Sequence, residues 1–184
     1  NLENVTVRLG HNRLLKDTKR LFSDDKVKDI SLIGRILLGI PTTLLGGVLS
    51  KLSRSDWYNP FTRTAHVYSD VKAIAGHEIG HAEDFQNKWY PTIYALARTL
   101  FPPLILYQEY KASQNSHRHL ADVDKWQTGR YLFPAFGTYV AAAFVNPFMK
   151  TASLLSTLFI VGSSYLLGKV YSNFKKFGNR KSAP

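Results

Sequence analysis

The sequence predicts a mainly α-helical protein with a minimal β element and two or three membrane helices. Three observations lead to this prediction: a histidine motif with helical spacing at residues 72–86, three long apolar runs, and an apolar content of 45%. A chain of 184 residues with this composition is long enough for one domain with a real core, and it is not typical of a disordered protein.

The composition limits the chemistry. Cysteine is absent, so the chain has no disulfide framework and no thiolate ligand, and a metal site must use nitrogen and oxygen atoms. The formal charge of +11 would suit nucleic acid, but the basic residues crowd next to apolar runs without any nucleic-acid module. We therefore expect membrane lipid as a partner and no nucleic acid.

Three regions are predicted. Residues 1–30 form a polar N-terminal arm that is partly helical around residues 12–22. Residues 31–124 hold the first membrane or interfacial segment and the metal-site region, and residues 125–184 form a membrane helical hairpin with a basic tail. Because residue 1 is asparagine, we expect a processed chain or a fragment. The expected location is the mitochondrial inner membrane if import processing removed the methionine, and otherwise a bacterial plasma membrane.

The first apolar run covers residues 30–49 and is about long enough to cross a bilayer. It contains Pro41 and one charge, Arg35, which lies near the end of the run and is expected to snorkel outwards. Our first interpretation of this run is a membrane span and our second is an interfacial helix. A buried helix of a soluble protein is the remaining alternative.

The motif His77-Glu78-Ile79-Gly80-His81 predicts a metal site. In a helix, this spacing puts both imidazoles on one face, where they can bind one zinc ion, and it leaves the Glu78 carboxylate free to act as a base. A helix that carries two histidines by chance is the alternative.

A catalytic zinc site needs a third protein ligand, and Glu109 is our prediction. In a helix, Glu109, Ser113 and His117 share one face, so Ser113 is expected to support a ligand. The rival ligands are His117 and Asp84, and Asp84 is better placed to brace an imidazole. His117 is also a candidate oxyanion partner.

Two segments flank the motif helix. Residues 62–69 alternate like a short strand, which in many zinc peptidases runs along the cleft and pairs with substrate. Residues 92–107 are apolar but interrupted by Pro102 and Pro103, so we expect a helix at the membrane surface, followed by a helix from residue 108 to about 120.

Four segments in order, YNPFTRTAHVYS, IAGHEIGHAEDF, QEYKAS and GTYVAAAFV, resemble the neutral membrane zinc metallopeptidases of the bacterial YugP-like group. The resemblance covers roughly residues 57–145. It implies His77 and His81 as zinc ligands, Glu78 as base, Glu109 as the remaining ligand and Ser113 as part of its motif. Lys111 stands where the group usually has an acid, and the stretch between His81 and Glu109 is short, which indicates a trimmed and divergent relative.

From residue 125 onwards there is no Asp or Glu. Two uncharged runs, residues 131–149 and 151–168, predict antiparallel membrane helices, with a tip at residues 146–150 and both basic flanks on one side. Two buried helices of a soluble bundle are the alternative.

Two functions follow. The first is an integral membrane zinc metallopeptidase with a small zincin-like unit, which hydrolyses a peptide or protein substrate through zinc-activated water. The second is a structural subunit of a membrane complex, such as a mitochondrial respiratory or ATP synthase assembly, that keeps the fold with or without activity. Its partners would be the other subunits of that complex.

Overall fold

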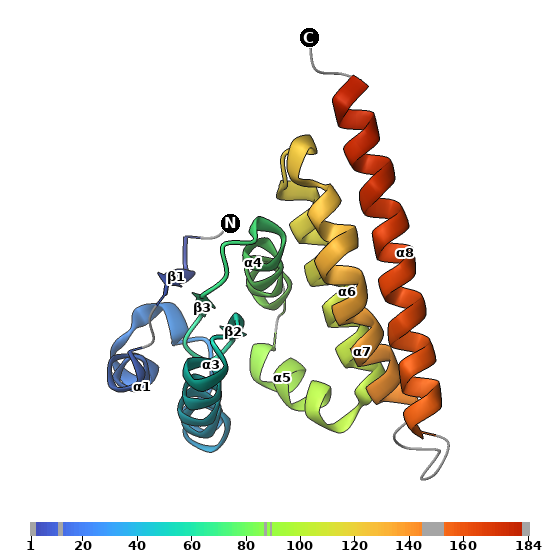
Figure 1. The fold of residues 1–184 in the computed structure, drawn as a ribbon. Helices are drawn as coiled ribbons and strands as arrows, with labels where there is room; N and C mark the ends of the chain where they lie inside the picture. The colour runs from blue at the N-terminus through green and yellow to red at the C-terminus, as the bar shows by residue number, and fades with distance from the viewer. Residues whose placement is uncertain (1–2, 11–12, 87, 89, 145–152, 182–184) are drawn as a thin grey trace. The chain divides into compact units, whose positions relative to one another are not determined.

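The computed structural model describes the chain except for residues 1–2, 11–12, 87, 89, 145–152 and 182–184. The protein is mainly α-helical with one three-stranded sheet, as predicted (Figure 1). It divides into two compact units: unit 1 holds residues 1–70 and 78–100, and unit 2 holds residues 71–77 and 101–184. The predicted boundaries after residues 30 and 124 each lie inside a unit.

The sheet of unit 1 consists of β1 (Thr6–Leu9), β2 (Trp57–Asn59) and β3 (Thr64–Val67), in the order β1-β3-β2. β1 is parallel to β3 and β2 is antiparallel to it. The strand predicted at residues 62–69 is therefore the central strand β3. Because both of its edges are paired, the expectation that substrate adds along this strand is wrong.

β1 was not predicted, because its inward-facing residue is charged. Val7 and Leu9 are exposed, whereas Arg8 is buried and its guanidinium donates to the buried carboxylate of Asp17. Asp17 belongs to α1 (Leu14–Ser23), so this ion pair fastens the first helix to the sheet. Breaking a buried pair by removing one partner costs about 3–5 kcal/mol, since the other charge stays buried.

Two apolar clusters form the core of unit 1. One consists of Leu21, Val27, Ile30 and Phe61, and the other of Tyr58, Ala65, Ala82 and Phe85. Both clusters contain residues from the YNPFTRTA segment, so this motif supplies the centre of unit 1. Asn59 within it is fully buried, and its side chain accepts from the backbone N–H groups of Phe61 and Thr62.

The predicted apolar run forms one helix, Leu32–Ser53, and it is the only candidate membrane span among the described residues. It consists of α2 (Leu32–Gly34), two π-helical stretches and α3 (Gly47–Ser53). An 18-residue stretch of this helix has a mean hydropathy of 1.7, and 22% of that stretch is buried in the chain. The core helix of a soluble protein or a signal sequence can have the same length and apolar composition.

One face of this helix packs and the other is exposed. Leu38 and Ile40 pack on the core, and the Thr43 hydroxyl accepts a 2.9 Å hydrogen bond from Asn59. Up to residue 49 the large exposed side chains are apolar, and they continue with Leu52 beside the exposed Lys51; they are Leu32, Ile33, Ile36, Leu37, Leu44, Leu45, Val48, Leu49 and Leu52. We call these nine side chains the apolar face.

Arg35 does not snorkel outwards as predicted. Its guanidinium donates to the backbone carbonyls of Ile30 at 2.7 Å and Leu21 at 3.1 Å. The charge therefore satisfies orphan carbonyls at the end of α1 and before the helix, and it is removed from the apolar face.

Two helices follow α4 (Lys72–Gln86): α5 (Pro91–Leu100) in unit 1 and α6 (Pro102–His119) in unit 2. The helix predicted from residue 108 thus begins six residues earlier. Pro102 and Pro103 do not break it, because the first turn of a helix has no intrahelical partner for the missing N–H groups.

In unit 2, a π-helical stretch (Thr128–Leu132) leads into α7 (Phe133–Phe144), which packs on α8 (Ser153–Lys181) (Figure 1). Gly129 lies against Gly168, and Gly137 lies against Ser164, so the helices are antiparallel, as predicted. A Cβ added at Gly168 would be 1.9 Å from the Gly129 carbonyl oxygen, which only a glycine avoids. The predicted tip at residues 146–150 lies outside the described residues.

The basic flanks of the hairpin meet at its open end. Lys176 Nζ lies 3.9 Å from the ring centroid of Trp126, and Lys175 Nζ lies 6.0 Å from that of Tyr171. Tyr171 and Lys175 both belong to α8, so it is the contact of Lys176 with Trp126 that places the segment before α7 beside the C-terminal half of α8. The two predicted spans themselves include side chains outside the described residues, so their relation to a membrane stays a prediction.

Candidate metal centre

Helix α4 carries the motif. It is continuous from Lys72 to Gln86, so His77 and His81 lie one turn apart on the same face, as the spacing predicts. His81 is buried, and the His77 side chain is 13% exposed. Glu78 follows His77 directly and is 8% exposed, so its carboxylate is shielded from bulk water.

Helix α6 supplies the third group. Glu109 is 1% exposed, and its Oε2 lies 3.0 Å from Nε2 of His77. Ligand atoms of His77, His81 and Glu109 all lie within 4.8 Å of one another. Within the part of the chain that the structure describes, this is the only group of three or more His, Asp and Glu residues close enough to hold a metal ion.

Ser113 lies one turn beyond Glu109 on α6. Its Oγ is 3.2 Å from Nδ1 of His77, while Nε2 of the same ring faces Glu109. If Nε2 is the ligand atom, Nδ1 carries the ring proton and donates a hydrogen bond to Ser113 Oγ. A partner of this kind fixes the tautomer and the orientation of a ligand imidazole.

Helices α4 and α6 approach closely beside these ligands. A Cβ added at Gly76 would be 2.8 Å from Ser116 Oγ, and this hydroxyl donates a 2.8 Å hydrogen bond to the backbone carbonyl of Ala73. Ser116 is fully buried. The glycine thus lets α6 come near enough for Glu109 to reach His77.

The N-terminus of α4 is also anchored. Lys72 Nζ lies 2.7 Å from an Asp124 carboxylate oxygen, and the Ala73 N–H donates to Gln127 Oε1 at 3.2 Å. Sequence reasoning missed Ser116 and Gln127. No motif marks them; the only signal was the small residue Gly76 directly before His77.

Asp84 pairs with Tyr94 and Lys88. Its carboxylate accepts a 2.6 Å hydrogen bond from the Tyr94 hydroxyl and lies 3.1 Å from Nζ of Lys88. Asp84 is 7% exposed and connects α4 to α5. The described contacts thus place it in a structural network of unit 1 and not against His77 or His81, where we expected it to brace a ring.

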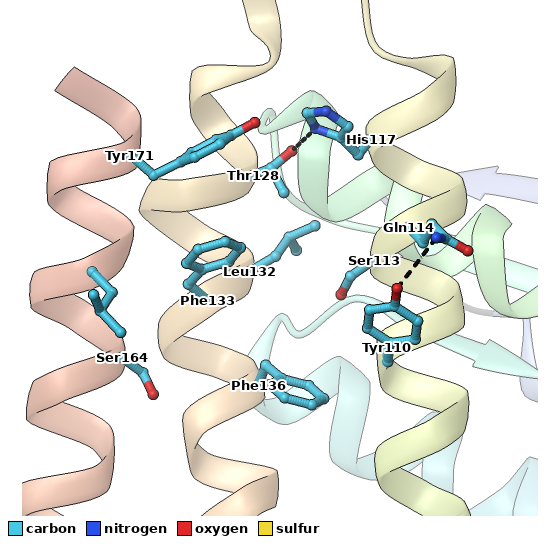
Figure 2. Close-up of a pocket in the computed structure, with 11 residues that line it drawn as sticks. Tyr110, Ser113, Gln114, His117, Thr128, Leu132, Phe133, Phe136, Ser164 and Tyr171 are labelled. Carbon is cyan, nitrogen blue, oxygen red and sulfur yellow. Dashed lines mark hydrogen bonds between the residues drawn. The ribbon is translucent and has the colours of Figure 1, made fainter. Parts of the chain in front are cut away.

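His117 lies on α6 beyond Ser113. Its Nδ1 is 3.2 Å from Thr128 Oγ1, and its ring packs edge-on against Tyr171. Burial lowers the pKa of His117 below its ordinary value, and the charges of Lys125 and Lys175 lower it further. His117 is not in the metal group; it lines a neighbouring cavity (Figure 2).

The donor set fits zinc. Two imidazole nitrogens and one carboxylate oxygen are the ligands of many catalytic zinc sites, with bonds of about 2.0–2.2 Å. In a tetrahedral site such ligand atoms are about 3.4 Å apart. The distance from His77 Nε2 to Glu109 Oε2 is 3.0 Å, and no two ligand atoms of the group are more than 4.8 Å apart. The value of a tetrahedral site lies between these two distances, so small side-chain movements would bring the three ligand atoms to zinc-binding positions.

Comparison with protein-family models, with curated proteins and with solved structures found no match to this chain.

Proposed function

We propose that this protein is a zinc-dependent peptidase with a zincin-like site, formed by His77, His81 and Glu109. The observation that carries the proposal is the convergence of these three side chains, from helices far apart in sequence, within 4.8 Å. The order of motifs shared with the YugP-like metallopeptidases supports the same function.

Zinc bound by this group would supply an activated water and polarise the carbonyl of a scissile peptide bond. Glu78 is the chain's own base: it accepts the proton of the attacking water and passes it to the leaving nitrogen. Ser113 holds His77 through Nδ1, so that Nε2 keeps its lone pair for the metal. Glu109 and His81 are buried, so bulk water competes little with the metal for their ligand atoms.

Membrane attachment is part of the proposal. The apolar face gathers nine exposed large apolar side chains on one helix, and exposed apolar patches of this kind are typical of membrane or protein contact sites. Charged residues flank the helix, including the exposed Lys51 and Arg54 at its C-terminal end. These features support attachment of unit 1 to a bilayer through this face, with the basic ends at the headgroups.

A structural subunit of a membrane complex is the second candidate. It is favoured by the sheet, in which the protein's own N-terminal strand β1 occupies the β3 edge that a substrate strand would need. In that case the metal group would support the fold without turnover.

The test is cleavage of a peptide library by the full-length protein in detergent with one equivalent of zinc. The Glu78→Gln variant should keep zinc and lose about 10²–10⁴-fold in rate. Glu83→Gln, on the same helix but outside the metal group, is the matched control and should cleave normally. Zinc binding without cleavage would favour the structural subunit, and failure to bind zinc would overturn both the site and the peptidase.

A further inference from the structure

Unit 2 contains a cavity of about 470 Å³ between α6, the stretch Thr128–Leu132, α7 and α8 (Figure 2). Its volume is within the range of about 300–1,000 Å³ of ligand pockets. Apolar groups make most of the wall: Leu132, Phe133, Phe136, Leu167 and the rings of Tyr110 and Tyr171.

The polar groups of the wall are largely paired with one another. Gln114 Nε2 donates to the Tyr110 hydroxyl at 3.3 Å, and His117 pairs with Thr128. Gln114 Oε1 is buried without a partner, but it lies on the side of the amide that faces away from Phe133 and Phe136 (Figure 2). The lowered pKa of His117 keeps its ring neutral at pH 7. The interior therefore favours an uncharged, apolar occupant.

The cavity adjoins the metal group through one side chain. Ser113 lines the cavity, and its Oγ lies 3.2 Å from His77 Nδ1. Tyr110, also in the wall, follows Glu109 directly in the chain. His77, Glu109 and the whole lining belong to unit 2, so the cavity and these two ligands form one compact arrangement.

We propose that this cavity receives a bulky apolar side chain, aromatic or long aliphatic, of the peptide that is cut at the metal group. This inference rests on the proposed function and names its substrate class. Successive residues of an extended peptide are about 3.3 Å apart, so a side chain one or two residues from the scissile bond would be within reach of the cavity, whose wall includes Ser113. The mainly apolar wall favours an apolar side chain and disfavours a charged one.

The experiment compares peptides with Phe or Ala beside the cleaved bond. We expect the wild-type protein to prefer Phe by about 10-fold or more in kcat/KM. Phe136→Trp, which narrows the cavity, should reduce this preference by about 10-fold, and Phe136→Ala should shift it to larger side chains. Phe174→Ala removes a ring of the same size from an exposed position of α8 outside the cavity and should change nothing.

Binding gives a readout that does not need turnover. In the Glu78→Gln protein, a fluorescent Phe peptide should bind more tightly than its Gly counterpart, and Phe136→Trp should weaken only the Phe peptide. Melting curves identify any variant that fails to fold. If Phe136→Trp does not fold, the Phe136→Ala protein is compared with the wild type in its place.

The outcomes separate the two proposals. Selective binding of the Phe peptide without cleavage would refute the peptidase, and with it the role of the cavity in cleavage, and would leave a cavity that binds an aromatic side chain. Glu78-dependent cleavage that ignores side-chain size and Phe136 would overturn the cavity assignment alone. Binding of a fluorescent fatty acid, but of neither peptide, would also overturn it in favour of a lipid site.

Discussion

Nε2 of His77 and Oε2 of Glu109 lie 3.0 Å apart, although 32 residues separate them in the chain. One atom belongs to α4 and the other to α6, and both helices contribute these residues to unit 2. The candidate metal centre depends on this contact more than on the motif, because only the contact adds a carboxylate to the two imidazoles.

Loss of a ligand should release zinc. We expect His77→Ala to abolish stoichiometric zinc binding, because two ligands cannot hold the ion in a protein site. His119→Ala, an exposed histidine at the end of α6, is the control and should retain one zinc per chain. The measurement is metal content after dialysis, together with competition against a chelator; full zinc in His77→Ala would refute the ligand assignment.

The close approach of α4 and α6 can be tested with a double-mutant cycle. Gly76→Ala should lower the melting temperature and weaken zinc binding, because the new methyl group meets Ser116 Oγ at 2.8 Å. Ser116→Ala in the same chain removes that oxygen, so the two changes should couple by about 0.5–3 kcal/mol.

Gly162→Ala is the control for that cycle. Its added Cβ would have no neighbour within 4 Å, so the helix should be unaffected or gain up to about 1 kcal/mol. Additive effects of Gly76→Ala and Ser116→Ala would show that the two residues do not touch as described.

Asn59 should be essential for unit 1. Asn59→Ala leaves the Phe61 N–H and the Thr43 hydroxyl without their partner, and each buried group left unpaired costs about 1–3 kcal/mol. Chemical denaturation should therefore show a large loss of stability. Asn173→Ala, exposed on α8, should be neutral. Similar midpoints for both variants would contradict the role of Asn59.

The lowered pKa of His117 gives a pH dependence of stability. Unfolded His117 takes up a proton near its ordinary value of 6.5, but folded His117 does so only at lower pH. The unfolded state therefore binds more protons in that window, and stability falls as the pH drops from 6.5 towards the folded pKa. Above that window His117 contributes nothing, because it is neutral in both states.

Two measurements check this. NMR titration of the His117 ring should give a midpoint below 6.5. The His117→Gln variant should lose less stability than the wild type between pH 7 and pH 5. A midpoint at or above 6.5 would contradict the assignment of His117 to a partly buried position near Lys125 and Lys175.

The helix Leu32–Ser53 should lie along the membrane surface, because its inner face packs on α1 and the core of unit 1 over much of its length. If the helix spanned the bilayer, the charged side chains of α1, which packs on it, would enter the hydrocarbon region. Each charge would then cost about 2.5–3.5 kcal/mol of insertion free energy. The chain has no cysteine, so Lys28→Cys and Lys51→Cys place single labels near its two ends.

In sealed vesicles, an impermeant maleimide should react with both single-cysteine proteins from the outside. Labelling of only one of them would show a spanning helix. If the protein does not float with vesicles at all, membrane attachment is wrong, and the apolar face must be covered by something else.

The sequence was most informative where a short-range pattern carries the information. The spacing of His77 and His81 predicts their common face, because four residues make about one helical turn whatever the surroundings. The apolar runs predict helices for the same reason. The pattern failed at β1, where Arg8 points inward and is compensated by Asp17, a partner that no local pattern reveals.

Apart from Glu109 and Ser113, which were expected near the two histidines, pairing across the chain could not be predicted in this way. Asp84 is a reasonable brace for an imidazole on its own helix, but Tyr94 and Lys88 bind it once α5 is packed. The strand at residues 62–69 is recognisable from its alternation, but its place at the centre of the sheet depends on β1, more than 50 residues earlier.

Sequence alone thus determined the mainly helical class, the motif helix and the nitrogen and oxygen chemistry of any metal, since these follow from composition and from spacing within one helix. Only the tertiary structure placed Glu109 and Ser113 against His77, and only it turned Arg35 inward. The physical reason is that these contacts depend on how closely separate helices approach. That distance is decided by small residues such as Gly76 and by buried hydrogen bonds such as that from Ser116 to Ala73, and of these two the sequence marks only the glycine.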